Sequence, residues 1–165
     1  MNFVFGPEPP YDVSRDGSQR ATGESHEPRS YRKTVGRSFS PQTVAVIGAT
    51  DRPGTVGRTV LQNLLDPAFR GSVYPVNPQR TEVLGVKAFK SIREVPEAVD
   101  LVVLATPAVT IPGLIGECIE MKAKSAVVIS AGFKERGAAG SALERQIQEQ
   151  LKQSSMRLIG RIAWG

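Results

Sequence analysis

Short apolar runs recur along the chain from Thr43 onward, and polar or glycine-rich segments separate them. Each run is only a few residues long and rich in valine, isoleucine and leucine. Continuous runs of this kind are typical of strands that are covered on both faces of a sheet. We therefore predict five strands, within residues 43–48, 72–78, 100–107, 125–130 and 156–160.

Helical periodicity fills three of the intervening segments. Residues 57–69 place Val60, Leu61, Leu64 and Leu65 on one helical face, and residues 108–123 and 141–154 also show a helical pattern. Short buried strands that alternate with helices predict an α/β fold, a Rossmann-like, doubly wound parallel sheet of about five strands with helices on both faces.

Finer details of these elements also follow from the pattern. Pro67 marks the end of the first helix, and Ser141 with Glu144 forms a capping box that begins the last one. Residues 83–95 predict a brief extended piece followed by a short helix.

Composition changes along the chain and divides it. Residues 1–40 are rich in proline, glycine, serine and charge, lack periodicity, and include the single histidine, His26. Such a segment cannot bury enough apolar surface to offset its ordering entropy, so we predict a disordered tail there. Residues 41–160 form the predicted domain, and residues 161–165 an atypical C-terminus.

Charge and cysteine content narrow the function. The formal net charge of +5 suits an anionic partner, but the bases form no stripe and aromatics are few, which argues against nucleic acid. The single cysteine, Cys118, excludes an internal disulfide and a multi-cysteine metal site, and we expect it to fill space in the core. No stretch reaches membrane-spanning length and no leader pattern is present, so we expect a cytoplasmic protein without a membrane partner.

Ligands of open α/β sheets lie at the carboxyl ends of the strands. The loop after the first predicted strand contains Gly48, Gly54 and Gly57, with Thr50, Thr55 and Arg52 between or beside them. These glycines allow close backbone approach, and the following helix directs its N-terminus at the same spot, which favours an anion site over a plain tight turn. The spacing is neither the dinucleotide fingerprint nor a Walker loop.

The loop after the second strand discriminates between nucleotides. A domain that binds NAD normally places an acid here to hold the ribose hydroxyls, whereas this chain has Asn77 and Arg80. An arginine suits a phosphorylated ribose, so the residues favour NADP or coenzyme A over NAD. A proline–asparagine turn with a solvated arginine is the alternative at this loop.

The loops after the third and fourth predicted strands carry no recognisable catalytic machinery. Ser130 has no base near it in the sequence pattern and is interpreted as a ligand contact rather than a nucleophile. Lys134 and Glu135 are interpreted as solvated charges. The pattern thus predicts a binding site without catalytic residues or a metal.

The ordered set of segments at 43–65, 71–89, 100–108, 126–135 and 156–160 resembles the CoA-binding domain of the nucleoside-diphosphate-forming acyl-CoA synthetases. That family includes ADP-forming acetate–CoA ligase, the α subunit of succinyl-CoA synthetase and fusions to protein lysine acetyltransferases. The resemblance runs from about Phe39 to Gly160.

The resemblance implies a role for each loop in binding coenzyme A. Thr50, Asp51, Arg52 and Pro53, with the helix start after Gly54, would hold the CoA phosphates. Val76, Asn77 and Pro78 would line the adenine–ribose side, and Arg80 takes the place of a family lysine that pairs with a CoA phosphate. Ala105, Thr106, Pro107, Ile129, Ser130 and Ala131 would line the pantetheine channel.

The chain departs from the family pattern after Gly160. The family continues into a Gly-Pro-Asn-Cys-x-Gly segment, a domain with a phosphorylated histidine and often an ATP-grasp module, and none of these is present here. We therefore expect a truncated module that binds CoA or acyl-CoA and is inactive alone, either as a homodimer or with a partner chain that supplies the ligase domains. The alternatives are an NADP-dependent oxidoreductase domain and a regulatory CoA-binding protein.

Overall fold

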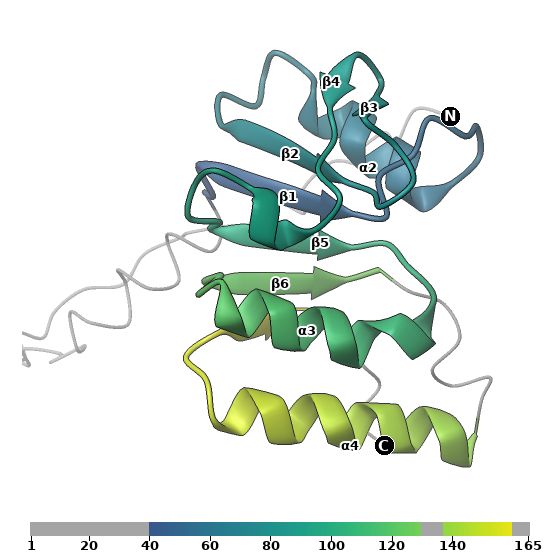
Figure 1. Cartoon of the computed structure of the whole chain (residues 1–165), viewed down its shortest axis with the longest axis vertical. Coiled ribbons are helices and arrows are strands. Elements are labelled where there is room, and N and C mark those ends of the chain that lie inside the picture. Colours follow the sequence, from purple (N-terminus) through teal and green to yellow (C-terminus); the bar gives the residue numbers. More distant parts are fainter. Residues whose placement is uncertain (1–39, 130–136, 160–165) are drawn as a thin grey trace, which may run out of the picture.

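A five-stranded parallel sheet forms the centre of the computed structural model, which describes residues 40–129 and 137–159 (Figure 1). Its strands are β1 (Thr43–Ile47), β2 (Ser72–Val76), β5 (Leu101–Leu104), β6 (Ser125–Val128) and β7 (Arg157–Ile159). They lie in the order β2-β1-β5-β6-β7, and every neighbouring pair is parallel. The predicted Rossmann-like α/β fold is therefore confirmed.

Helices cover both faces of this sheet: α2 (Val56–Leu64) one face, and α3 (Ile111–Glu120) and α4 (Ala138–Lys152) the other (Figure 1). All five residues of β1 are buried, and the last four alternate between the two cores. Val44 and Val46 share a cluster with Leu61 of α2, a leucine with no exposed surface. Burying a leucine fully contributes about 1.5–3 kcal/mol, so this contact anchors α2 on the sheet.

The other core joins β1 to α3 and α4. Ala45 and Ile47 belong to the cluster that contains Ile115 of α3 and Ile147 of α4. Cys118 of α3 lies in the same cluster with no exposed surface, as expected for a residue that fills space. Burial, followed by the charge of Glu117, raises the pKa of its thiol to about 12. None of the helices in the described residues is long and apolar enough to cross a membrane.

Residues 82–94 differ from the predicted brief extended piece and short helix. They form an antiparallel hairpin of β3 (Glu82–Val83) and β4 (Val86–Lys87), followed by the 3-10 helix η1 (Ile92–Glu94). Leu84 and Gly85 connect the two strands with φ of +50° and +78°. Two successive residues at positive φ produce a tight hairpin turn. Leucine seldom adopts that conformation, so a turn centred on Leu84 is not expected from its residue type.

The starts of two helices also differ from the prediction. The 3-10 helix η2 (Ala108–Thr110) precedes α3, and α4 begins at Ala138, with Gly137 as its N-cap. Ser141 lies in the first turn of α4, where its backbone N–H donates to the carbonyl of Gly137. The predicted capping box of Ser141 and Glu144 is therefore wrong, because the N-cap is Gly137, four residues before Ser141.

The strand order reverses direction between β1 and β5, since β2 lies on one side of β1 and β5 on the other. Hydrogen bonds hold the carboxyl ends of these three strands together. The N–H of Gly48 donates to Val76 at 3.0 Å, and that of Ala105 donates to Ile47 at 2.9 Å. Such a reversal is where open α/β sheets bind their ligands.

Candidate functional site

The loops that follow β1, β2 and β5 meet at this end of the sheet, and we call residues 48–58, 77–81 and 105–107 the carboxyl-end rim. Gly48, which has a φ of +90°, lies where the loop after β1 contacts the loop after β5. A Cβ atom on it would lie 2.5 Å from the carbonyl oxygen of Ala105 and 2.8 Å from the Thr106 methyl group. A glycine is therefore required where the first and third loops touch.

Gly57, in the first turn of α2, makes a second close approach. A Cβ atom on this residue would overlap the carbonyl oxygen of Gly48. Gly54 serves a different purpose, because its φ is +76° while the space around a Cβ atom is open. Two of the three predicted glycines thus bring backbone segments together, and the third lets the chain turn.

The N-terminus of α2 is exposed to a ligand because no side chain caps it. Thr55 is the N-cap residue, but its hydroxyl donates to the carbonyl of Arg52 at 2.7 Å and makes no cap hydrogen bond. The first turn contains no acidic residue. The N–H groups of the first turn lack intrahelical acceptors, and the helix dipole is positive there, so this terminus favours an anion.

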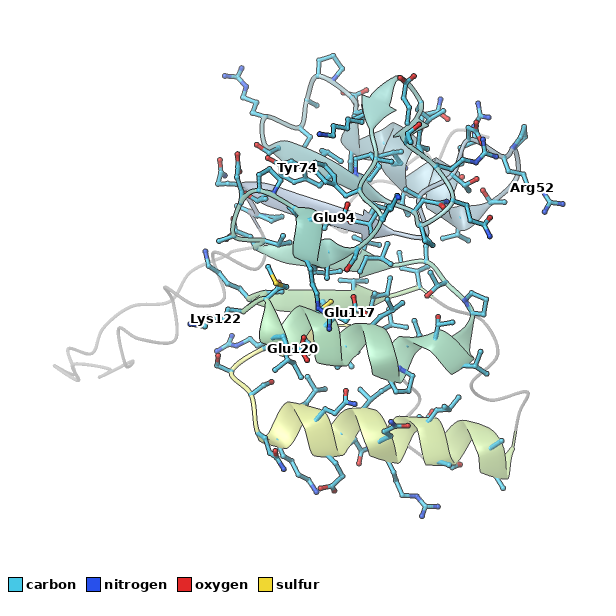
Figure 2. All side chains as sticks on the ribbon, in the orientation of Figure 1. Arg52, Tyr74, Glu94, Glu117, Glu120 and Lys122 are labelled. Carbon is cyan, nitrogen blue, oxygen red and sulfur yellow. The ribbon has the colours of Figure 1, made fainter. Side chains whose placement is uncertain are left out.

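The turn before α2 is held by local hydrogen bonds. The backbone N–H of Arg52 donates to the hydroxyl of Thr50 at 3.2 Å. Arg52 and Pro53 are exposed, and Figure 2 shows the Arg52 side chain projecting outward from the loop. Its guanidinium therefore lies at the surface of the rim.

Two side chains tie the loop after β2 to the loop after β1. The Asn77 amide donates to the carbonyl of Ala49 at 2.8 Å, while its oxygen accepts from the N–H of Gln79. A guanidinium nitrogen of Arg80 lies 3.3 Å from a carboxylate oxygen of Asp51. Val76 is buried beneath this loop and Pro78 is exposed on it. The structure thus brings the residues predicted in the first two loops into one contiguous surface.

Arg58 belongs to the same surface and was missed in the sequence reasoning. It lies in the first turn of α2, and its guanidinium donates to the carbonyl of Asp51. The available signal was a basic residue at the positive end of a helix, where a cation is unfavourable unless something else holds it. The rim therefore carries three arginines, Arg52, Arg58 and Arg80, against one acid.

The third and fourth loops are only partly described. Ala105 and Thr106 are half-buried, the Thr110 hydroxyl lies 2.9 Å from that of Thr106, and Pro107 is exposed. The N–H of Ile129 donates to Leu104 at 2.9 Å, and its side chain is 41% exposed. Ser130 and Ala131, like Lys134 and Glu135, lie outside the described residues.

A hollow of about 980 Å³ lies beside the C-terminal half of α2. Arg58 is the one residue that lines both this hollow and the rim. Amide and apolar side chains such as Gln62, Leu65 and Phe69 make up much of its lining. It lacks the free helix terminus and the cluster of arginines, so we place the candidate site at the rim. Within residues 40–129 and 137–159, no group of histidine, cysteine and acidic side chains could hold a metal ion.

Comparison with known proteins identifies the family of the chain. A family model described as CoA binding domain matches residues 42–163. The chain is 44% identical over 124 residues to the ADP-forming acetate–CoA ligase I of Archaeoglobus fulgidus, covering 75% of this chain and 18% of that protein. It is 36% identical over 126 residues to the α subunit of ADP-forming acetate–CoA ligase I of Pyrococcus furiosus, covering 74% of this chain and 27% of that subunit.

A solved structure shows the same likeness. The apo form of dinucleotide-forming acetyl-coenzyme A synthetase 1 from Ca. Korarchaeum cryptofilum superposes with a TM-score of 0.70 and 37% identity. The match covers 76% of this chain and 27% of the other. This chain thus spans less than a third of each of these three relatives. The expected resemblance is confirmed, and the chain belongs to the CoA-binding domain family found in ADP-forming acyl-CoA synthetases.

Proposed function

We propose that the chain binds CoA or acyl-CoA at the carboxyl-end rim, as the cytoplasmic CoA-binding module of a protein related to ADP-forming acyl-CoA synthetases. One observation carries the proposal: the N-terminus of α2 has no side-chain cap and lies among three arginines. Membership in the CoA-binding domain family supports the same ligand.

The chemistry of the rim fits the phosphates of CoA. The N–H groups at the start of α2 supply donors and a positive dipole, and Thr50, Asp51, Arg52, Pro53 and Gly54 form the turn over them. Donors of this type bind phosphate through charge-assisted hydrogen bonds, which are about twice as strong as neutral ones. We assign the pyrophosphate of CoA to this turn.

The second loop would hold the phosphorylated ribose. Val76, Asn77 and Pro78 form the wall for adenine and ribose, and Arg80 lies where an NAD-binding domain would carry an acid. The pantetheine arm would follow Ala105, Thr106 and Pro107 toward the exposed side chain of Ile129. Ser130 and Ala131 complete this proposed channel in sequence.

The module would act on the CoA thiol through another chain or domain. We propose that it presents bound CoA to ligase domains in a partner chain, either as a monomer or as a homodimer, and has no catalysis of its own. Assay of acyl-CoA formation with the purified chain, ATP, CoA and acetate should then show no turnover. Turnover by the chain alone would contradict this part of the proposal.

Calorimetric titration of wild type and Arg80→Glu with CoA tests the binding proposal. Charge reversal removes a charge-assisted phosphate contact and should weaken CoA binding by about 1–3 kcal/mol, or roughly 5- to 150-fold. Arg145→Glu is the matched control. Arg145 is exposed on α4, away from the rim, and its replacement changes the net charge by the same amount as Arg80→Glu.

NADP and NAD titrations separate the alternative function. A CoA-binding module should bind CoA more tightly than either dinucleotide. Micromolar binding of NADP together with no binding of CoA would replace the proposal with an NADP-dependent oxidoreductase domain, because Arg80 suits the phosphorylated ribose of either ligand.

A further inference from the structure

Asp51 is the one acid among the described residues of the carboxyl-end rim, and it contacts two of the three arginines. Its carboxylate pairs with Arg80 from the loop after β2, 29 residues away in sequence, and its carbonyl accepts from Arg58 of α2. A carboxylate in a site that collects phosphates repels the ligand. Its position therefore requires an explanation beyond phosphate binding.

The geometry of the pair indicates that it opens easily. A single contact of 3.3 Å joins the two side chains, which are 48% and 46% exposed. Exposed pairs with one contact contribute little to stability. The Asn77 amide holds the same two loops together independently, through its 2.8 Å bond to Ala49, so the loops stay in place when Arg80 leaves Asp51.

We propose that Asp51 competes with the ligand's 3′-phosphate for Arg80, and so lowers the affinity advantage of a ligand that carries this phosphate over one that lacks it. In the free protein the Asp51 carboxylate pairs with the Arg80 guanidinium. A ligand can bind Arg80 only if its anionic group displaces this carboxylate. This inference rests on the proposed function, and it identifies the 3′-phosphate of CoA as the group that makes the exchange.

The exchange distinguishes ligands by charge. A phosphate monoester carries a charge near −2 and three acceptor oxygens, and it can take the planar guanidinium from a monoanionic carboxylate through two parallel bonds. A ribose hydroxyl is neutral and cannot. Dephospho-CoA, which has the pyrophosphate and the pantetheine arm but a 3′-hydroxyl, therefore leaves the Arg80–Asp51 pair closed.

The test compares CoA with dephospho-CoA by calorimetry, using wild type, Asp51→Asn, Arg80→Gln and the double variant. In Asp51→Asn, CoA no longer competes with a carboxylate, so the ratio of CoA affinity to dephospho-CoA affinity should rise roughly two- to fivefold. In the Arg80→Gln background the same change should not move the ratio. Asp51→Glu, which restores a carboxylate, should return it toward the wild-type value.

Controls separate this effect from general changes in charge or stability. Glu149→Gln removes one acid from an exposed pair with Lys152 on α4 and should leave the ratio unchanged. Thermal unfolding without ligand establishes that Asp51→Asn is folded, and Asp51→Ser takes its place if it is not.

Three outcomes would overturn the inference alone. Equal tightening of both ligands would mean that Asp51 does not act on the 3′-phosphate, and a lower ratio would mean that it aligns Arg80 for the ligand. A shift that persists without Arg80 would show that Asp51 acts by another route. Wild-type protein that binds no CoA would instead overturn the proposed function, and this inference with it.

Discussion

The two ends of the parallel sheet arrange the same groups in opposite ways. At the amino end, Asp100 precedes β5, and its carboxylate accepts from the N–H groups of Gln42 at 2.9 Å and Thr43 at 3.3 Å, where β1 begins. Lys124, which precedes β6, pairs with the other carboxylate oxygen. At the carboxyl-end rim, the N–H groups of α2 receive no carboxylate, and Asp51 is directed to arginines instead.

The burial of the two acids and the pKa of Asp100 follow this difference. The Asp100 side chain is 14% exposed, against 46% for Asp51. Burial by itself raises the pKa of Asp100, but the Lys124 hydrogen bond, the two backbone donors and the Lys124 charge together outweigh it and lower the pKa. At the amino end, the Asp100 carboxylate is thus paired with Lys124 and with two backbone N–H groups, and these interactions stabilise the fold. The carboxyl end retains unsatisfied donors, which are available to a ligand.

Gly57→Ala should produce the largest effect and would break the carboxyl-end rim. The added methyl group overlaps the Gly48 carbonyl, and backbone on both sides prevents an easy adjustment. We expect a loss of about 2–4 kcal/mol in the free energy of unfolding, measured by chemical denaturation.

Gly113→Ala is the matched control for that change. Gly113 lies in α3, where a Cβ atom would meet nothing within 4 Å. Alanine is the better helix former, so this variant should be as stable as wild type or more stable by up to about 1 kcal/mol. Equal stability of Gly57→Ala and wild type would contradict the close contact of α2 with the loop after β1.

Thr55→Asp would place a carboxylate against free backbone N–H groups at the carboxyl end, as Asp100 does at the amino end. An aspartate at the N-cap can accept from the free N–H groups of α2, which should stabilise the helix by a few tenths of a kcal/mol. The same carboxylate occupies the donors proposed for phosphate, so CoA affinity should fall about tenfold, equivalent to about 1.4 kcal/mol.

Thr55→Asn separates the two effects of that substitution. It supplies a cap of similar size without a charge, and its CoA affinity should lie between those of wild type and Thr55→Asp. Unchanged CoA affinity in Thr55→Asp would place the phosphates away from α2.

Asp100→Asn tests the amino end and should have the smallest effect. The variant keeps one acceptor but loses the charge, so it should be less stable by about 1 kcal/mol at pH 7, with its CoA affinity unaltered. Because the folded-state pKa of Asp100 lies below the unfolded value, its contribution is complete above that unfolded value. It is lost as the pH falls through the folded pKa.

Urea unfolding between pH 3 and 7 measures this dependence. The stability difference between wild type and Asp100→Asn should be constant from about pH 5 upward and shrink as the pH falls below 4. A difference that grows toward low pH would contradict the direction of the pKa shift.

The sequence predicts the central strands because parallel strands must be apolar on both faces. Residues 43–47 show this directly, since all five are buried and all were placed in a strand. The hairpin at Leu84–Gly85 could not be predicted in the same way, because β3 and β4 are two residues each and carry no periodicity. The start of α4 was misplaced because the segment Ala138-Ala139-Gly140 gives weak local signals, and Ser141 is as compatible with a helix interior as with a cap.

The candidate site divides along similar lines. Gly48, Gly57 and Thr55 could be placed from local pattern, because a strand that runs into a glycine-rich turn and a helix fixes where the helix terminus faces. The contact of Asp51 with Arg80 could not, because it depends on β2 lying beside β1 in the sheet, and the contact with Arg58 depends on how the turn before α2 folds. Sequence identified which residues carry charge, but only the fold shows which charges neutralise one another.

The proline in β2 has a consequence for self-association. β2 is an edge strand, and Pro75 has no N–H to offer to another chain. The N–H of Phe89 donates to the Pro75 carbonyl, and the Phe89 carbonyl accepts from Asn77, so the carboxyl half of this edge is already occupied from within. A strand from a second molecule therefore has no free backbone groups to pair with at this part of the edge. This protects the sheet against edge-to-edge aggregation next to the loop proposed to bind the ligand.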